Sequence, residues 1–150
     1  RDVETINERQ RESFVRKIEK SVGNVRGKSF GVWGLAFKPD TDDMRSAPSI
    51  DIINMLLDKG VSKIKAYDPV AIEVAKRSLP EVVEFTENEK DAAAGADVLL
   101  ILTEWSHWQE WSPEQIASVL SGKHVIDGRN VFDPEEMREA GLEYISVGRM

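Results

Sequence analysis

In this 150-residue chain, the residues that could most clearly bind a ligand are two cations, each of which follows a buried strand pattern. Lys38 comes directly after an apolar run that begins at Ser29, and Arg129 lies in a tight turn after another apolar run. An ammonium can hold a phosphate as a point charge, and a planar guanidinium can grip one with two parallel hydrogen bonds. The two residues therefore predict a bound anion. The alternative is that both are solvated surface cations.

A glycine loop after the first strand pattern supports a nucleotide-like ligand, but its motif is incomplete. On the dinucleotide pattern G-x-G-x-x-G, Gly34 takes the first position, whereas Ala36 and Pro39 take the second and third. Alanine keeps the backbone from approaching a pyrophosphate closely, and proline removes an N–H donor. Asp68, after the second strand pattern, could hold a ribose hydroxyl or could serve as a turn residue before a proline. The loop alone is a weak predictor of dinucleotide binding.

The remaining chemically notable side chains indicate structure rather than reaction. Trp105, Trp108 and Trp111 recur every three residues, which favours core or interface packing over a platform for stacking a base. His107 and His124 are isolated and show no metal-ligand spacing. No nucleophile–base order and no paired-carboxylate motif is present. The sequence thus predicts a binding edge, with no metal site and no complete catalytic group.

Alternating strand and helix patterns from Ser29 onward would position these residues. Strands are predicted at residues 29–37, 63–67, 82–85, 97–102, 124–126 and 142–145, with helices at 48–59, 71–78, 88–94, 113–120 and 134–140. Such alternation indicates an α/β fold, a Rossmann-like doubly wound domain with a six-stranded, mostly parallel sheet. Ligands bind beyond the carboxyl ends of the strands in such sheets, which is where Lys38 and Arg129 fall.

A long amphipathic helix is predicted before this domain. Residues 2–20 carry apolar side chains at helical spacing, and a glycine at position 23 is a plausible helix stop. Its narrow apolar stripe could pack on its own domain, or the helix could be a spacer or a dimerisation element. The chain opens at Arg1 inside this pattern, so we expect a piece of a longer protein. We expect residues 1–24 to end a central helix and residues 25–150 to form the binding domain.

The composition limits which classes of partner and which cellular compartment we expect. A formal charge of −7 argues against nucleic acid, because binding to a phosphate backbone needs a basic face. No apolar run approaches the about 20 residues that cross a bilayer, and no signal-peptide pattern is present, so no membrane contact is expected. The chain has no cysteine, which excludes disulfides and a thiol nucleophile and fits a cytoplasmic protein.

Several motifs together closely resemble the C-terminal domain of the UDP-glucose/GDP-mannose dehydrogenase family. The likeness runs from about residue 3 to the end of the chain, and its most similar branch is UDP-glucose 6-dehydrogenase. The motifs are Gly34 to Ser49, Ala66 to Pro69, Ala96-Asp97, Thr103-Glu104-Trp105, Asp127 to Asn130 and Val147-Gly148-Arg149. Each motif alone is unspecific, but the set is specific.

The resemblance implies a function and assigns roles. In that family an N-terminal Rossmann domain binds NAD, a central helix mediates dimerisation, and the C-terminal domain binds the nucleotide part of the sugar donor. By motif, Phe37, Lys38 and Arg129 would contact the nucleotide-sugar, and Arg45 would reach the NAD held by the other domain. From its neighbours alone, Arg45 could equally pair with Asp42 or Asp43.

The resemblance also implies a reaction that this chain cannot perform alone. The family oxidises the C6 alcohol of a UDP-sugar to a carboxylate in two NAD-dependent steps, using a cysteine of the N-terminal part. We therefore expect a UDP-sugar as ligand, an absent N-terminal NAD-binding domain as partner and a homodimer, and no activity from this chain by itself. The sequence does not separate UDP-glucose from UDP-N-acetylated sugars or GDP-mannose. The alternative is a non-catalytic assembly or regulatory module on the same fold.

Overall fold

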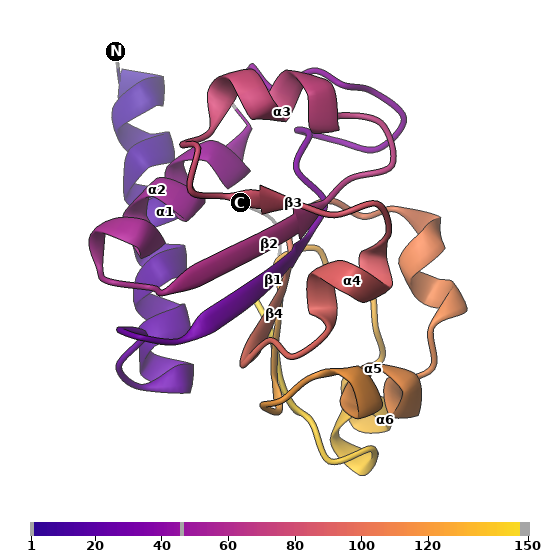
Figure 1. Ribbon diagram of the computed structural model, residues 1–150. Coiled ribbons are helices and arrows are strands. Elements are labelled where there is room, and N and C mark those ends of the chain that lie inside the picture. Colours follow the sequence, from indigo (N-terminus) through magenta and orange to yellow (C-terminus); the bar gives the residue numbers. More distant parts are fainter. Residues whose placement is uncertain (1, 46, 148–150) are drawn as a thin grey trace.

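The computed structural model describes residues 2–45 and 47–147, with side chains from Arg9 onward. Over this part the chain forms one six-stranded sheet in the order β3-β2-β1-β4-β5-β6, and every neighbouring pair is parallel (Figure 1). The strands are β1 Ser29–Trp33, β2 Lys63–Tyr67, β3 Glu84–Phe85, β4 Val98–Ile101, β5 His124–Asp127 and β6 Glu143–Ser146. This order is that of a Rossmann domain, so the predicted fold class is confirmed.

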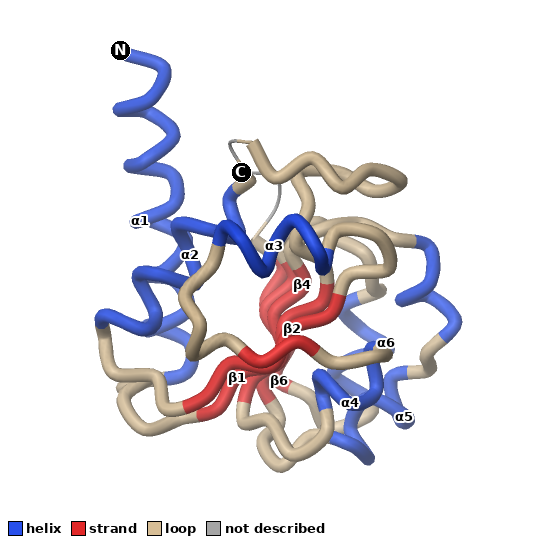
Figure 2. The backbone as a smooth tube through the Cα atoms, turned by 45° about the horizontal axis from the view of Figure 1, so that its top comes forward, coloured by secondary structure: helices blue, strands red, loops and turns tan. Residues whose placement is uncertain are grey.

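Helices cover both faces of the sheet, as Figure 2 shows. They are α1 Asp2–Val22, α2 Pro48–Asp58, α3 Ile72–Ser78, α4 Glu89–Ala93, α5 Pro113–Val119, α6 Pro134–Glu139 and the short 3₁₀ helix η1 Ser106–Glu110. Alternate residues of each strand face opposite layers. Phe30 and Val32 of β1 pack with α1, α2 and α3, whereas Trp33 packs with the layer of α4, η1, α5 and α6. No described helix is long and apolar enough to cross a membrane.

The first predicted strand is too long, and the reason is local. The pattern predicts residues 29–37, but β1 ends at Trp33 because Gly34 has a φ of +97° and turns the chain. A Cβ at Gly34 would lie 2.5 Å from the Cβ of Thr103, so only glycine fits this turn. The predicted strand at 82–85 is likewise reduced to Glu84–Phe85, and η1 is not predicted by the pattern.

The carboxyl-terminal half of α1 belongs to the core of this domain. Phe14, Val15 and Ile18 are buried in the layer that α1 and α2 share. Arg11 of α1 forms an ion pair with Asp51 of α2. Of the two expectations for this helix, packing on its own domain is therefore confirmed for this half. The assignment of residues 1–24 to the end of a central helix stays a prediction.

Candidate functional site

The loops that follow β1, β4 and β5 form one continuous edge. These strands are neighbours in the parallel sheet, so their carboxyl ends lie side by side. The hydroxyl of Thr103, after β4, donates to the carbonyl of Ala36, after β1, at 2.7 Å. The next residue, Glu104, bonds to Arg129 after β5. These contacts tie the three loops together at the end of the sheet where a Rossmann-like domain binds its ligand.

Arg129 is held at this edge by a two-point ion pair. Its Nε donates to Oε1 of Glu104 at 2.7 Å, and its Nη2 donates to Oε2 at 3.2 Å. The Arg129 side chain is only 10% exposed, and that of Glu104 is 32% exposed. Arg129 is therefore not a solvated surface cation. Glu104 is part of the Thr103-Glu104-Trp105 motif, but the sequence did not predict this pairing.

Phe37 and Lys38 lie on the β1 loop of the same edge and are exposed. Phe37 is 50% exposed, which is unusual for a large apolar residue in the described part of this chain. The amide of Phe37 donates to the carbonyl of Asp43 at 3.2 Å, which folds the loop back on itself. Lys38 is close enough to Asp43 for its charge to contribute to lowering the pKa of that carboxyl. An exposed ring beside an exposed ammonium can contact a base or sugar and an anion.

Asp68, which follows β2, accepts hydrogen bonds from the backbone of the glycine loop that follows β1. Its Oδ2 accepts from the amides of Leu35 at 2.8 Å and Ala36 at 3.2 Å. Its Oδ1 accepts from the amides of Val70 and Ala71, both at 2.9 Å. The side chain is buried. Of the two roles considered for Asp68, the structure supports the turn residue, because this carboxylate is engaged with four backbone donors.

A second buried carboxylate shapes the loop that carries Arg129. Asp127 accepts from the amides of Arg129 at 2.8 Å, Val131 at 2.7 Å and Phe132 at 3.2 Å. It also accepts from the hydroxyl of Tyr144 at 2.6 Å. Burial, and then the hydrogen bond to this carboxylate, raise the pKa of Tyr144. The backbone of the Arg129 turn is thus fixed independently of the guanidinium.

Arg45 projects from the segment that follows the β1 loop. Its Nε and Nη2 each lie 3.0 Å from a carboxylate oxygen of Asp43, and its side chain is 91% exposed. The hydrogen bonds from Arg45 lower the pKa of Asp43 to about 2. Of the two roles considered for Arg45, pairing with a neighbouring aspartate is present, with Asp43, and the contact to NAD stays a prediction. A pocket of about 580 Å³ lies between residues 41–45 and two residues of α3, Val74 and Ser78.

The tryptophans form a packed cluster beneath the edge. Trp108 stacks on Trp33 with ring centroids 5.0 Å apart, and Trp111 lies 5.3 Å from Trp33. The indole N–H of Trp108 donates to the carbonyl of Thr103 at 2.7 Å. Packing rather than base stacking is therefore confirmed for these rings. The cluster fixes Thr103, and so supports the β4 loop from below.

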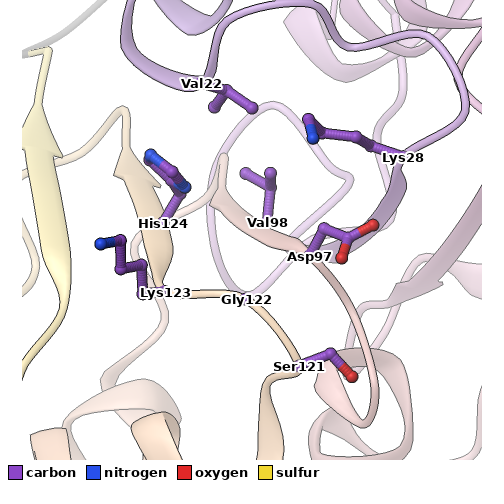
Figure 3. A pocket seen from close by; sticks show the side chains of 8 residues that line it. All are labelled: Val22, Lys28, Asp97, Val98, Ser121, Gly122, Lys123 and His124. Atoms are coloured by element: carbon purple, nitrogen blue, oxygen red, sulfur yellow. The ribbon is translucent and has the colours of Figure 1, made fainter.

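A further pocket lies at the opposite edge of the sheet, where β1, β4 and β5 begin (Figure 3). Its volume is about 360 Å³, and Val22 and Val98 are among its apolar lining residues. His124, which starts β5 as expected, lies 3.1 Å from a carboxylate oxygen of Glu143, and Lys123 lies 3.3 Å from the other oxygen. This pocket is at the amino ends of the strands, away from the edge where Rossmann-like domains bind nucleotides.

The sheet order, the turn at the end of β1 and the cationic loops at the carboxyl edge define the class: a Rossmann-type nucleotide-binding domain. Residues 31–134 match the model of the UDP-glucose/GDP-mannose dehydrogenase family, UDP binding domain, and the chain belongs to this family. The matched span includes Phe37, Lys38, Arg45 and Arg129. The resemblance inferred from the motifs is thereby confirmed, although Gly148 and Arg149 of its last motif lie outside the described residues.

Relatives and solved structures agree with this membership. The chain is 45% identical over 143 residues to UDP-glucose 6-dehydrogenase TuaD of Bacillus subtilis, covering 95% of this chain and 31% of that protein. It is 40% identical over 146 residues to UDP-glucose 6-dehydrogenase YwqF of the same species, covering 96% and 32%. A UDP-glucose dehydrogenase structure from Pyrobaculum islandicum superimposes with a TM-score of 0.79 at 31% identity, covering 99% and 32%. The chain thus spans about a third of the length of these relatives.

Proposed function

We propose that this chain binds the nucleotide part of a UDP-sugar at the carboxyl edge of its sheet. In this proposal the Phe37 ring contacts the base or sugar, and Lys38 and Arg129 hold the diphosphate. The single observation that supports it best is the continuous edge itself. The β1 loop with its exposed ring and ammonium is joined through Thr103 and Glu104 to a nearly buried guanidinium. Membership of a UDP-binding domain family supplies the class of ligand.

The glycine loop of this domain does not fit NAD. The amides of Leu35 and Ala36, which would face a pyrophosphate, already donate to the Asp68 carboxylate. A dinucleotide phosphate there would meet that negative charge at short range. We therefore place NAD on the absent N-terminal domain of the longer protein. Arg45, whose side chain is exposed, is our candidate for a contact from this chain to that cofactor.

For the longer protein we propose an NAD-dependent UDP-sugar 6-dehydrogenase that converts UDP-glucose to UDP-glucuronate. The names of the relatives support this activity, and a catalytic cysteine would come from the absent N-terminal part. We further propose a cytoplasmic homodimer in which α1 continues a central helix. This chain contains no cysteine and should not oxidise a sugar by itself.

The binding proposal is tested by titrating UDP into the chain in a calorimeter. Lys38→Ala and Arg129→Ala should each weaken UDP binding by about tenfold or more, as expected when a charged contact to a phosphate is lost. Lys28→Ala is the matched control, because this substitution removes a charge of the same sign at the opposite edge of the sheet. Equal affinities in all four proteins would contradict the assigned site. Absence of any UDP binding by the unaltered chain would contradict the function proposed for it.

The identity of the sugar nucleotide needs a separate measurement. A thermal-shift comparison of UDP, UDP-glucose, UDP-N-acetylglucosamine, GDP and GDP-mannose would rank the ligands, since a ligand that binds only the folded state raises the melting temperature. We expect the uridine nucleotides to stabilise the chain more than the guanosine nucleotides. The reverse order would contradict the uridine assignment.

A further inference from the structure

We propose that Glu104 is a positioning residue for Arg129, an inference that rests on the proposed function. Glu104 occupies the Nε–Nη2 side of the guanidinium through bonds of 2.7 Å and 3.2 Å. A guanidinium has five N–H donors in a fixed plane, so both protons of Nη1 and one of Nη2 remain on its end. That end can form two parallel bonds to a phosphate while the carboxylate stays in place. Glu104 would then bind the Nε–Nη2 side of the guanidinium, and a diphosphate would bind the end formed by Nη1 and Nη2.

The surroundings fix Arg129 before any ligand arrives. Its amide is bound to Asp127, which also holds the following turn through Val131 and Phe132. Its side chain is 10% exposed, so the guanidinium has little room to move while Glu104 is present. A group that is already ordered loses less conformational freedom when it binds, and its contact adds more to affinity.

The negative charge of Glu104 acts in the opposite sense, because it repels a diphosphate. Two observations favour the positioning effect as the larger one. Glu104 is 32% exposed, so water screens its charge. Arg129 is nearly buried, and a buried cation that loses its partner is strongly destabilised, which would drive the guanidinium out of its present place. Removing Glu104 should therefore weaken the binding of UDP.

The test is calorimetry with UDP on five proteins. They are the unaltered chain, Glu104→Gln, Arg129→Met, the double variant, and Glu73→Gln as a control that removes one charge from an exposed ion pair on α3. We expect Glu104→Gln to weaken UDP binding by about tenfold. The double variant should bind like Arg129→Met within about twofold, because the proposed effect of Glu104 on UDP is exerted through Arg129. In the unaltered chain, UDP should shift the Nε–H resonance of Arg129, and Glu73→Gln should leave affinity unchanged.

Several outcomes separate this inference from the proposed function. UDP binding by Glu104→Gln that equals or exceeds that of the unaltered chain overturns the inference alone. A double variant that binds much more tightly than Arg129→Met also overturns it, because Glu104 would then act on the ligand by its charge. If thermal melting shows that Glu104→Gln is unfolded, this second comparison still decides, since removing both members of the ion pair leaves no nearly buried charge without its partner. No UDP binding by the unaltered chain overturns both proposals.

Discussion

Asp68→Ala should be among the most destabilising single substitutions at the carboxyl edge. The variant removes the acceptor of four backbone N–H groups at distances of 2.8 to 3.2 Å, and three of these hydrogen bonds lie in buried surroundings. Each buried donor left without a partner costs about 1–3 kcal/mol. Water can reach the amide of Val70, whose side chain is half exposed. We therefore expect a loss of about 3–9 kcal/mol in the free energy of unfolding, counted from the three buried donors.

Urea unfolding followed by tryptophan fluorescence measures this loss, because Trp33 and Trp108 are fully buried. In a thermal melt, a domain of this size loses about 2–4 °C of melting temperature per kcal/mol, so the melting temperature of Asp68→Ala should be lower by about 6 °C at least. Asp58→Ala is the matched control, since that aspartate is exposed at the end of α2, and it should change stability by less than about 0.5 kcal/mol. If Asp68→Ala melted like this control, the claim that the carboxylate holds the glycine loop would be wrong.

Three further predictions follow from the geometry. Burial raises the pKa of Tyr144, so the folded state binds the phenol proton more tightly than the unfolded state does. The stability that this raised pKa contributes is fully present below the ordinary pKa of about 10 and is lost at higher pH. Tyr144→Phe should therefore flatten the fall in melting temperature above pH about 10. The carbon-13 NMR signal of the Asp43 carboxyl should titrate near pH 2 in the unaltered chain and at a higher pH in Arg45→Ala, short of 3.8 because the amide at position 45 and the charge of Lys38 still lower the pKa; one unchanged midpoint would contradict the pairing. Gly34→Ala should cost about 2–4 kcal/mol, since it combines a φ of +97° with a Cβ contact of 2.5 Å, whereas Gly23→Ala meets no atom within 4 Å and should cost about 1 kcal/mol in the same denaturation assay.

The sheet could be predicted because its central strands are unbroken apolar runs. Val98–Ile101 is buried at every position, so its composition alone indicates a strand covered on both faces. The edge strand Glu84–Phe85 is short and partly exposed, which leaves its pattern ambiguous. The helix η1 has only five residues, too few to show a period. Packing was nevertheless correctly expected for its Trp108 and for the flanking Trp105 and Trp111.

The site was only partly predictable for a different reason. The position of Arg129 follows from the strand pattern, since a parallel sheet collects strand ends at one edge. Its partner Glu104 is 25 residues earlier, and the two meet only because β4 and β5 are neighbours. Asp68 looked compatible with two roles because local sequence shows a turn before a proline but not the distant amides of Leu35 and Ala36. Side-chain partners across loops depend on strand order, which a single sequence does not display.

The pairing of Arg129 with Glu104 has a kinetic consequence. The formal charge of the chain is −7, and the carboxylate of Glu104 largely cancels the charge of Arg129 at a distance. From beyond about 10 Å a diphosphate therefore meets net repulsion rather than steering. Its association rate should rise as salt is added, the opposite of what an open basic cleft produces. Attraction would begin only at the last few ångströms, where the free end of the guanidinium and the ammonium of Lys38 come within reach.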